Sequence, residues 1–143
     1  TPLTLEEPWY LVVIPDAQVS TAEIFAAPEL TRDCDALTIS GFLSGDHGLN
    51  VCEPVVRARF PRVAEALDWL GRFAPARMSG TGACVFASFP ERRAADEARR
   101  CLPVGWPGDA IAHPCWPGSS YTVRNVRGDP VRAKRNAWGV AKR

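Results

Sequence analysis

A glycine-rich segment in the middle of the chain comes closest to a phosphate-binding loop. It reads Ser79-Gly80-Thr81-Gly82 and precedes an apolar run over residues 84–89. Two glycines around a threonine allow backbone conformations that other residues avoid, so a phosphate or a second backbone can approach closely. A tight turn between two strands explains the same glycines. The Walker pattern and the G-x-G-x-x-G fingerprint are both missing, and the pattern alone leaves both interpretations open.

Other reactive residue types do not assemble into a recognisable site. His47 and His113 have no neighbours in sequence that would activate a nucleophile, and neither stands at zinc-ligand spacing from a pair of cysteines. We expect the thiols to be reduced and mostly buried, because free cysteine packs as a small hydrophobe. The cysteines are an odd number at wide spacings: Cys34, Cys52, Cys84, Cys101 and Cys115.

The composition is typical of a globular protein of one domain, with 143 residues, of which 46% are hydrophobic and 23% are charged. Because the sequence shows no secretory signal, we expect a cytoplasmic protein. No apolar run approaches the ~20 residues that a membrane-spanning helix needs. The net charge of +1 is unevenly distributed. Residues 1–101 are net acidic and contain no lysine, whereas residues 102–143 are net basic and contain both lysines.

The hydrophobic pattern predicts an α+β domain. Residues 9–14 are an apolar, β-branched run that ends at Pro15, which is typical of a buried strand. Ser20, with Glu23 three residues later, predicts the start of a short helix that Pro28 stops.

Further elements are predicted along the rest of the chain. They are a short helix over 38–43, a helix that Asn50 caps and that carries residues 51–60, the clearest helix from Pro61, a strand over 84–89 and an alanine-rich helix over 91–100. Residues 110–112 make a poor strand where the domain needs one, and periodicity ends at Pro114.

Four blocks, in the same order along the chain, resemble the GHMP kinase family. They cover roughly residues 5–105, which makes the resemblance far more specific than the glycine motif alone. The narrower likeness is to members that phosphorylate a cytidine-diphosphate-linked sugar alcohol in non-mevalonate isoprenoid biosynthesis. The blocks lie at residues 9–15, at residues 20–30, at residues 50–61 and at residues 76–86.

The resemblance implies that residues 1–108 are the C-terminal domain of such a kinase, with a ferredoxin-like antiparallel sheet backed by helices. In the family, the N-terminal half supplies the ATP-phosphate loop and the catalytic aspartate and lysine. We therefore assign no catalytic residue to this chain and expect it to be inactive alone. ATP and Mg²⁺ are expected cofactors of the full-length kinase and not of this chain. The expected partners are the cytidine-diphosphate-linked substrate and an N-terminal kinase half.

The resemblance also assigns site residues. Phe25 would stack on the cytosine ring, and Thr21 would line the same pocket; the alternative for Phe25 is a core position, because buried phenylalanine is common. Ser79, Gly80, Thr81 and Gly82 would pack beside the ATP-phosphate loop and support it. Ala22 departs from the family pattern, since some members have proline there.

Residues 109–143 do not match the family's usual ending. We expect this atypical basic tail to be disordered or derived from a frameshift near Gly108 and Asp109. One alternative is a basic arm that binds nucleic acid electrostatically, although scattered charge is usually solvated. Another is that the chain is a free-standing nucleotide-ligand-binding or regulatory module that keeps the substrate half of the pocket.

Overall fold

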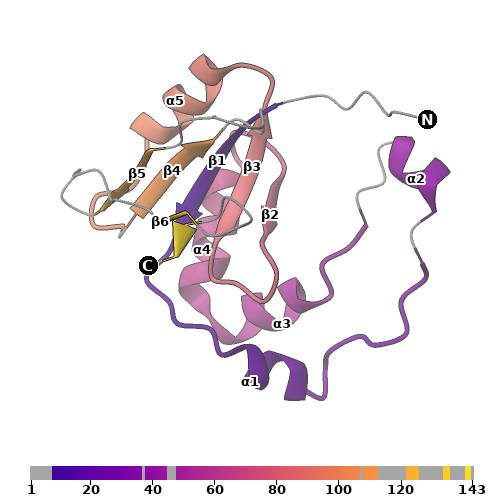
Figure 1. Ribbon diagram of the computed structural model, residues 1–143. Coiled ribbons are helices and arrows are strands. Elements are labelled where there is room, and N and C mark those ends of the chain that lie inside the picture. The colour runs from indigo at the N-terminus through magenta and orange to yellow at the C-terminus, as the bar shows by residue number, and fades with distance from the viewer. Residues whose placement is uncertain are drawn as a thin grey trace.

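The computed structural model describes residues 8–36, 38–44, 48–106, 108–112, 122–125, 134–135 and 141–142. Figure 1 shows the arrangement of its elements. The strands are β1 (Trp9–Ile14), β2 (Ala76–Met78), β3 (Val85–Phe89), β4 (Gly108–Ala112), β5 (Thr122–Asn125), β6 (Lys134–Arg135) and β7 (Ala141–Lys142). The helices are α1 (Thr21–Ala26), α2 (Ile39–Leu43), α3 (Cys52–Arg59), α4 (Pro61–Leu70) and α5 (Arg92–Arg100). Among the described residues, no helix has the length and apolar character needed to cross a membrane.

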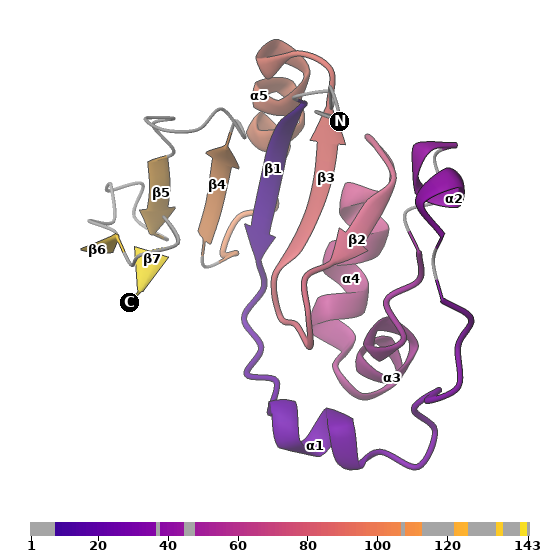
Figure 2. The ribbon, with the colours of Figure 1, turned by 45° about the vertical axis from the view of Figure 1, so that its right-hand side comes forward.

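Five strands form one antiparallel sheet in the order β2-β3-β1-β4-β5 (Figure 2). The first four strands have the order of the ferredoxin-like βαββαβ arrangement, in which the two crossovers carry helices. Here α4 and α5 pack against the sheet, and the shorter helices α1, α2 and α3 are inserted between β1 and α4. The expected α+β class and ferredoxin-like sheet are confirmed.

The hydrophobic core lies between the sheet and these helices. Alternation along β1 buries Leu11 and Val13, and the antiparallel register places Ala87 and Val85 opposite them on the same face. Burial on one face fixes this register, because a slip of one residue would expose the whole set. The helices contribute Ile24, Val55, Val56, Val63, Ala66, Leu67, Leu70, Ala95 and Ala98.

Most predicted elements form where the pattern placed them. The Ser20 hydroxyl accepts the Glu23 N–H at 3.4 Å and caps α1, and Pro61 opens α4. The alanine-rich helix buries Ala95 and Ala98 against the sheet, as its small-residue face predicted. One prediction was wrong: the thiols of the described residues are not mostly buried.

Of the four described cysteines, only Cys52 is buried, while Cys84 is half-buried and Cys34 and Cys101 are exposed. Cys101 is exposed because it follows the last turn of α5, and Cys34 lies outside the regular elements. Burial of a cysteine therefore depends on its element and not on residue type alone.

The weak strand signal at residues 110–112 does produce a strand. Residues 108–112 pair with β1, so the expected domain boundary at 108 coincides with the first residue of β4. In the basic tail the structure describes only the rest of β4 and the short strands β5, β6 and β7. His47, His113 and Cys115 lie outside the described residues.

Candidate functional site

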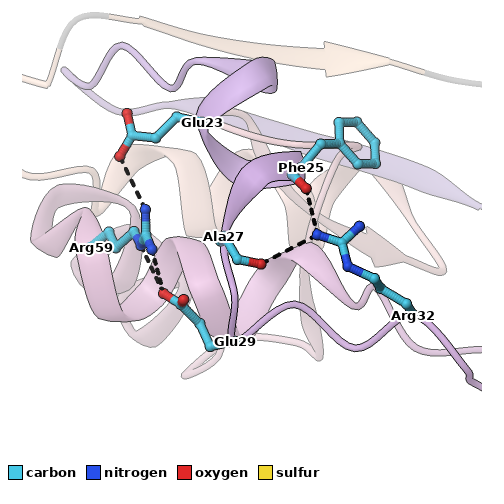
Figure 3. Close-up of polar contacts among 6 residues, drawn as sticks. All are labelled: Glu23, Phe25, Ala27, Glu29, Arg32 and Arg59. Carbon is cyan, nitrogen blue, oxygen red and sulfur yellow. Dashed lines mark hydrogen bonds and ion pairs between the residues drawn. The ribbon is translucent and has the colours of Figure 1, made fainter.

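Helix α1 is a six-residue helix that presents Phe25 to solvent. Ile24 is fully buried and Ala27 nearly so, which anchors the helix on the core through one face. The Phe25 side chain remains 54% exposed, and its ring points away from the pair formed by Glu23 and Arg59 (Figure 3). The alternative of a core position for Phe25 is therefore excluded by its exposure.

Thr21 lies one turn before Phe25 on the same helix, and positions four apart share a helix face. Its Oγ1 lies 3.0 Å from Oγ1 of Thr81, so the two hydroxyls share a hydrogen bond. This contact brings together two segments to which the family resemblance assigns different tasks. The exposed aromatic ring and the glycine turn consequently belong to one surface of the molecule.

The glycine turn connects β2 to β3 at the end of the sheet near α1 and α3 (Figure 2). Ser79 N–H donates to the Cys84 carbonyl and Gly82 N–H donates to the Ser79 carbonyl, both at 2.9 Å. Gly80 and Gly82 adopt φ angles of +56° and +95°, in the region that favours glycine. A Cβ on Gly80 would meet nothing within 4 Å, so its outer side is open to another group.

Arg59, the last residue of α3, bridges Glu23 in the first turn of α1 and Glu29 in the segment that follows α1 (Figure 3). Its guanidinium lies 2.7 Å from the Glu29 carboxylate and 3.4 Å from that of Glu23. A hydrogen bond from its own backbone and the hydrogen bond from Arg59 hold the pKa of Glu29 below its ordinary value. The hydrogen bond to Glu29 raises the pKa of Arg59, which stays charged.

Arg32 completes the support of α1 from the segment that follows it. Its guanidinium donates to the carbonyl of Phe25 at 2.6 Å and to that of Ala27 at 3.4 Å (Figure 3). The last carbonyls of a helix have no partner within the helix, and a cationic side chain there satisfies them. Arg32 thus fixes the backbone of the residue that carries the exposed ring.

Two residues near the turn were not among the predicted site residues. The Asn50 amide donates to the carbonyls of Met78 and Gly80, and the Glu53 carboxylate accepts the Met78 N–H. The only signal in the sequence was their place in one of the blocks that carry the family resemblance, since spacing alone predicted only a helix cap at Asn50.

The arrangement of these groups suits recognition of a planar ligand. An exposed aromatic ring can stack on a planar base, and hydroxyls beside it can exchange hydrogen bonds with a ligand. Within the described part of the chain, no cluster of three His, Cys, Asp or Glu side chains could hold a metal ion. The described residues thus offer an exposed aromatic ring and hydroxyl groups beside a glycine turn.

Comparison with known proteins identifies relatives for most of the chain. Residues 30–107 match the family described as GHMP kinases C terminal. The 4-diphosphocytidyl-2-C-methyl-D-erythritol kinase of Nitrosococcus oceani is 60% identical over 107 residues, which cover 75% of this chain and 38% of that protein. The protein of the same name from Halorhodospira halophila is 57% identical over 100 residues, covering 70% of this chain and 34% of that protein.

A third protein of that name, from Alkalilimnicola ehrlichii, is 54% identical over 108 residues, covering 76% of this chain and 37% of that protein. The chain thus spans a little over a third of the length of the curated relatives it matches. The Ser79–Gly82 turn lies inside the matched family region, whereas Thr21 and Phe25 precede it. On this evidence the chain belongs to the GHMP kinase family and contains its C-terminal domain.

Proposed function

We propose that this chain is the substrate-binding C-terminal half of an ATP-dependent kinase. Its substrate would be 4-diphosphocytidyl-2-C-methyl-D-erythritol, an intermediate of non-mevalonate isoprenoid biosynthesis, and its location the cytoplasm. The names of the relatives support this reaction. The observation that carries the substrate role is the exposed Phe25 ring, which shares a helix face with Thr21 beside the glycine turn.

The role of each residue follows from its place on this surface. Phe25 stacks on the cytosine ring from one side, which is worth ~1–3 kcal/mol for a base on an aromatic side chain. Thr21 lines the same pocket, and Ser79, Gly80, Thr81 and Gly82 support the ATP-phosphate loop of the N-terminal half. The open space outside Gly80 fits the close approach of another backbone at that point.

ATP and Mg²⁺ belong, in this proposal, to the complete kinase, and the chain alone is inactive. Phosphoryl transfer depends on positioning the reactants and neutralising the charge of the transferred group. This half contributes positioning of the substrate and of the phosphate loop. The groups that neutralise charge and accept the substrate proton are assigned to the N-terminal half.

A chimera tests the proposal directly. The N-terminal part of the Nitrosococcus oceani kinase, up to the matched region, is joined to this full chain, and ADP formation is measured. We expect turnover that requires both ATP and 4-diphosphocytidyl-2-C-methyl-D-erythritol, with none from the chain alone. A chimera with a cooperative melting transition but no kinase activity contradicts the kinase role.

Titration of the full chain with cytidine diphosphate separates this function from that of a free-standing module. Half of a stacking site is expected to bind the nucleotide weakly, at millimolar concentrations or not at all. Micromolar binding by the isolated chain would favour the nucleotide-binding or regulatory module instead.

A further inference from the structure

The start of α3 lies against the glycine turn, and the proposed function gives it no role. Residues 50–53 belong to one of the blocks that carry the family resemblance. In the structure they contact the last residue of β2 and the first glycine of the turn. This contact connects segments that are about 30 residues apart in sequence.

Asn50 uses its whole side chain in this contact. Its Nδ2 donates to the Met78 carbonyl at 2.9 Å and to the Gly80 carbonyl at 2.8 Å. Its Oδ1 accepts the N–H of Cys52 at 3.1 Å and so also caps the first turn of α3. A carboxamide is the uncharged side chain that offers two donors and an acceptor in one plane.

Glu53, in the first turn of α3, also binds Met78. Its carboxylate accepts the Met78 N–H at 3.1 Å, so Asn50 and Glu53 together bind both polar backbone groups of Met78. Arg77 adds a hydrogen bond at 3.0 Å to the Gly48 carbonyl. Side chains and loop backbone thus hold the outer edge of β2, where the sheet ends.

The turn needs such an external restraint because its own sequence is permissive. Gly80 and Gly82 both adopt positive φ, and glycine loses more conformational freedom on ordering than any other residue. The Asn50 amide binds the carbonyl of Gly80 directly before Thr81, whose hydroxyl reaches Thr21. The Asn50 side chain therefore restrains the glycine turn next to the residue that contacts α1.

We propose that Asn50 is a positioning residue, which holds the Ser79–Gly82 turn in the conformation that supports the ATP-phosphate loop. The inference rests on the proposed function for its kinetic consequence, but the restraint itself is a property of this chain alone. The positioning role predicts that loss of the two Asn50 N–H donors raises the KM for ATP more than the KM for the substrate.

The sharpest variant is Asn50→Asp, which keeps the acceptor for Cys52 and replaces both donors by a charge that repels two carbonyls. Thr38→Ala is the matched control for a helix cap, because Thr38 Oγ1 caps α2 by accepting the Gly41 N–H at 3.0 Å. Ala98→Gly is the control for general destabilisation, because Ala98 is buried in α5 and away from the turn.

Amide hydrogen exchange of the full chain tests the restraint without reference to activity. We expect the Ser79 and Gly82 amides to exchange at least about tenfold faster in Asn50→Asp, as the loss of two hydrogen bonds implies. The two controls should leave these amides unchanged relative to the rest of the sheet. Unchanged exchange at Ser79 and Gly82 in Asn50→Asp overturns the inference.

Kinetics of the chimera test whether the position of the turn affects the use of ATP. In Asn50→Asp we expect the KM for ATP to rise about tenfold, while the KM for 4-diphosphocytidyl-2-C-methyl-D-erythritol stays within about twofold. A purely structural defect would lower the active fraction, and hence kcat alone, as Ala98→Gly should. An inactive wild-type chimera counts against the proposed function, whereas an active one in which Asn50→Asp has wild-type constants overturns the positioning role.

Discussion

Thr21 on α1 and Thr81 in the β2–β3 turn share a hydrogen bond between their hydroxyl oxygens, 3.0 Å apart. The two residues are 60 positions apart in sequence, and the family resemblance assigns them to different tasks. Their contact joins the glycine turn to the helix that carries Phe25. In the proposed function, this contact connects the helix that binds the substrate with the turn that supports the phosphate loop.

A double-mutant cycle measures this connection. Thr21→Val and Thr81→Val each remove a hydroxyl at constant volume, and the coupling free energy should be ~0.5 kcal/mol in unfolding because the pair is exposed. Thr21→Ser keeps the hydroxyl and should retain most of the coupling. Strictly additive losses in chemical denaturation would show that the hydrogen bond does not form in solution.

Removal of the Phe25 ring should affect binding and not folding. Because the side chain is 54% exposed, Phe25→Ala should change the free energy of unfolding by less than ~0.5 kcal/mol. In the chimera it should raise the KM for the cytidine-containing substrate about tenfold or more, the loss expected for one stacked base. Ile39→Ala, an exposed apolar residue on another short helix, is the control and should leave the KM unchanged.

The two glycines of the turn should differ in their tolerance of a side chain. Gly80→Ala should cost ~1–2 kcal/mol through its positive φ alone, because open space surrounds it. Gly82→Ala should cost more, since its Cβ would also lie 3.2 Å from Met78 Sδ and 3.4 Å from Val19 Cγ2. Urea denaturation checks this order, which equal losses at the two positions would contradict.

Gly80→Asn tests whether the cost of a side chain at this position comes from the positive φ rather than from steric contact. Asparagine tolerates positive φ better than alanine, so this variant should be more stable than Gly80→Ala.

In the chimera, Gly80→Val and Gly82→Val should both lower kinase activity if the turn supports the phosphate loop. Wild-type kinetics for both valine variants would count against that assignment.

The Glu29 carboxylate should make stability depend on pH in the acid range. Its own backbone hydrogen bond and the Arg59 contact lower its folded pKa below the ordinary value of 4.5, so its contribution is present above that pH. The contribution is lost as the pH falls through the folded pKa. The difference in unfolding free energy between wild type and Glu29→Gln should therefore be constant near neutral pH and shrink below pH 4.5.

Arg59→Gln removes the second of these causes and should weaken the same pH dependence without abolishing it, because the backbone hydrogen bond remains. A pH profile of Glu29→Gln parallel to that of wild type down to acid unfolding would contradict the proposed pKa shift. Thermal melts across the acid range provide the measurement.

Truncation tests where the domain boundary falls. A chain that ends at residue 112 retains β4, whereas one that ends at residue 107 leaves β1 as the edge of the sheet. We expect the shorter chain to lose ~2–4 kcal/mol of stability, because several backbone hydrogen bonds of β1 lose their partner. Equal melting temperatures for the two chains would place the boundary at or before residue 107.

Local sequence determined the elements whose signals are self-contained. The β-branched run of β1, the Ser20 cap of α1 and the apolar stripe that begins at Pro61 each specify an element through neighbours within a few positions. The similarity of four ordered blocks was likewise enough to identify the family, because order along the chain adds specificity to each short motif.

Tertiary structure alone decided the elements and contacts that depend on distant partners. The three residues of β2 and the weak run of β4 become strands because β3 and β1 offer unpaired backbone groups beside them. Phe25 is exposed because α1 packs against the core with the face that carries Ile24. The Asn50 amide finds its carbonyls only when α3 lies beside the glycine turn, a geometry that no local pattern encodes.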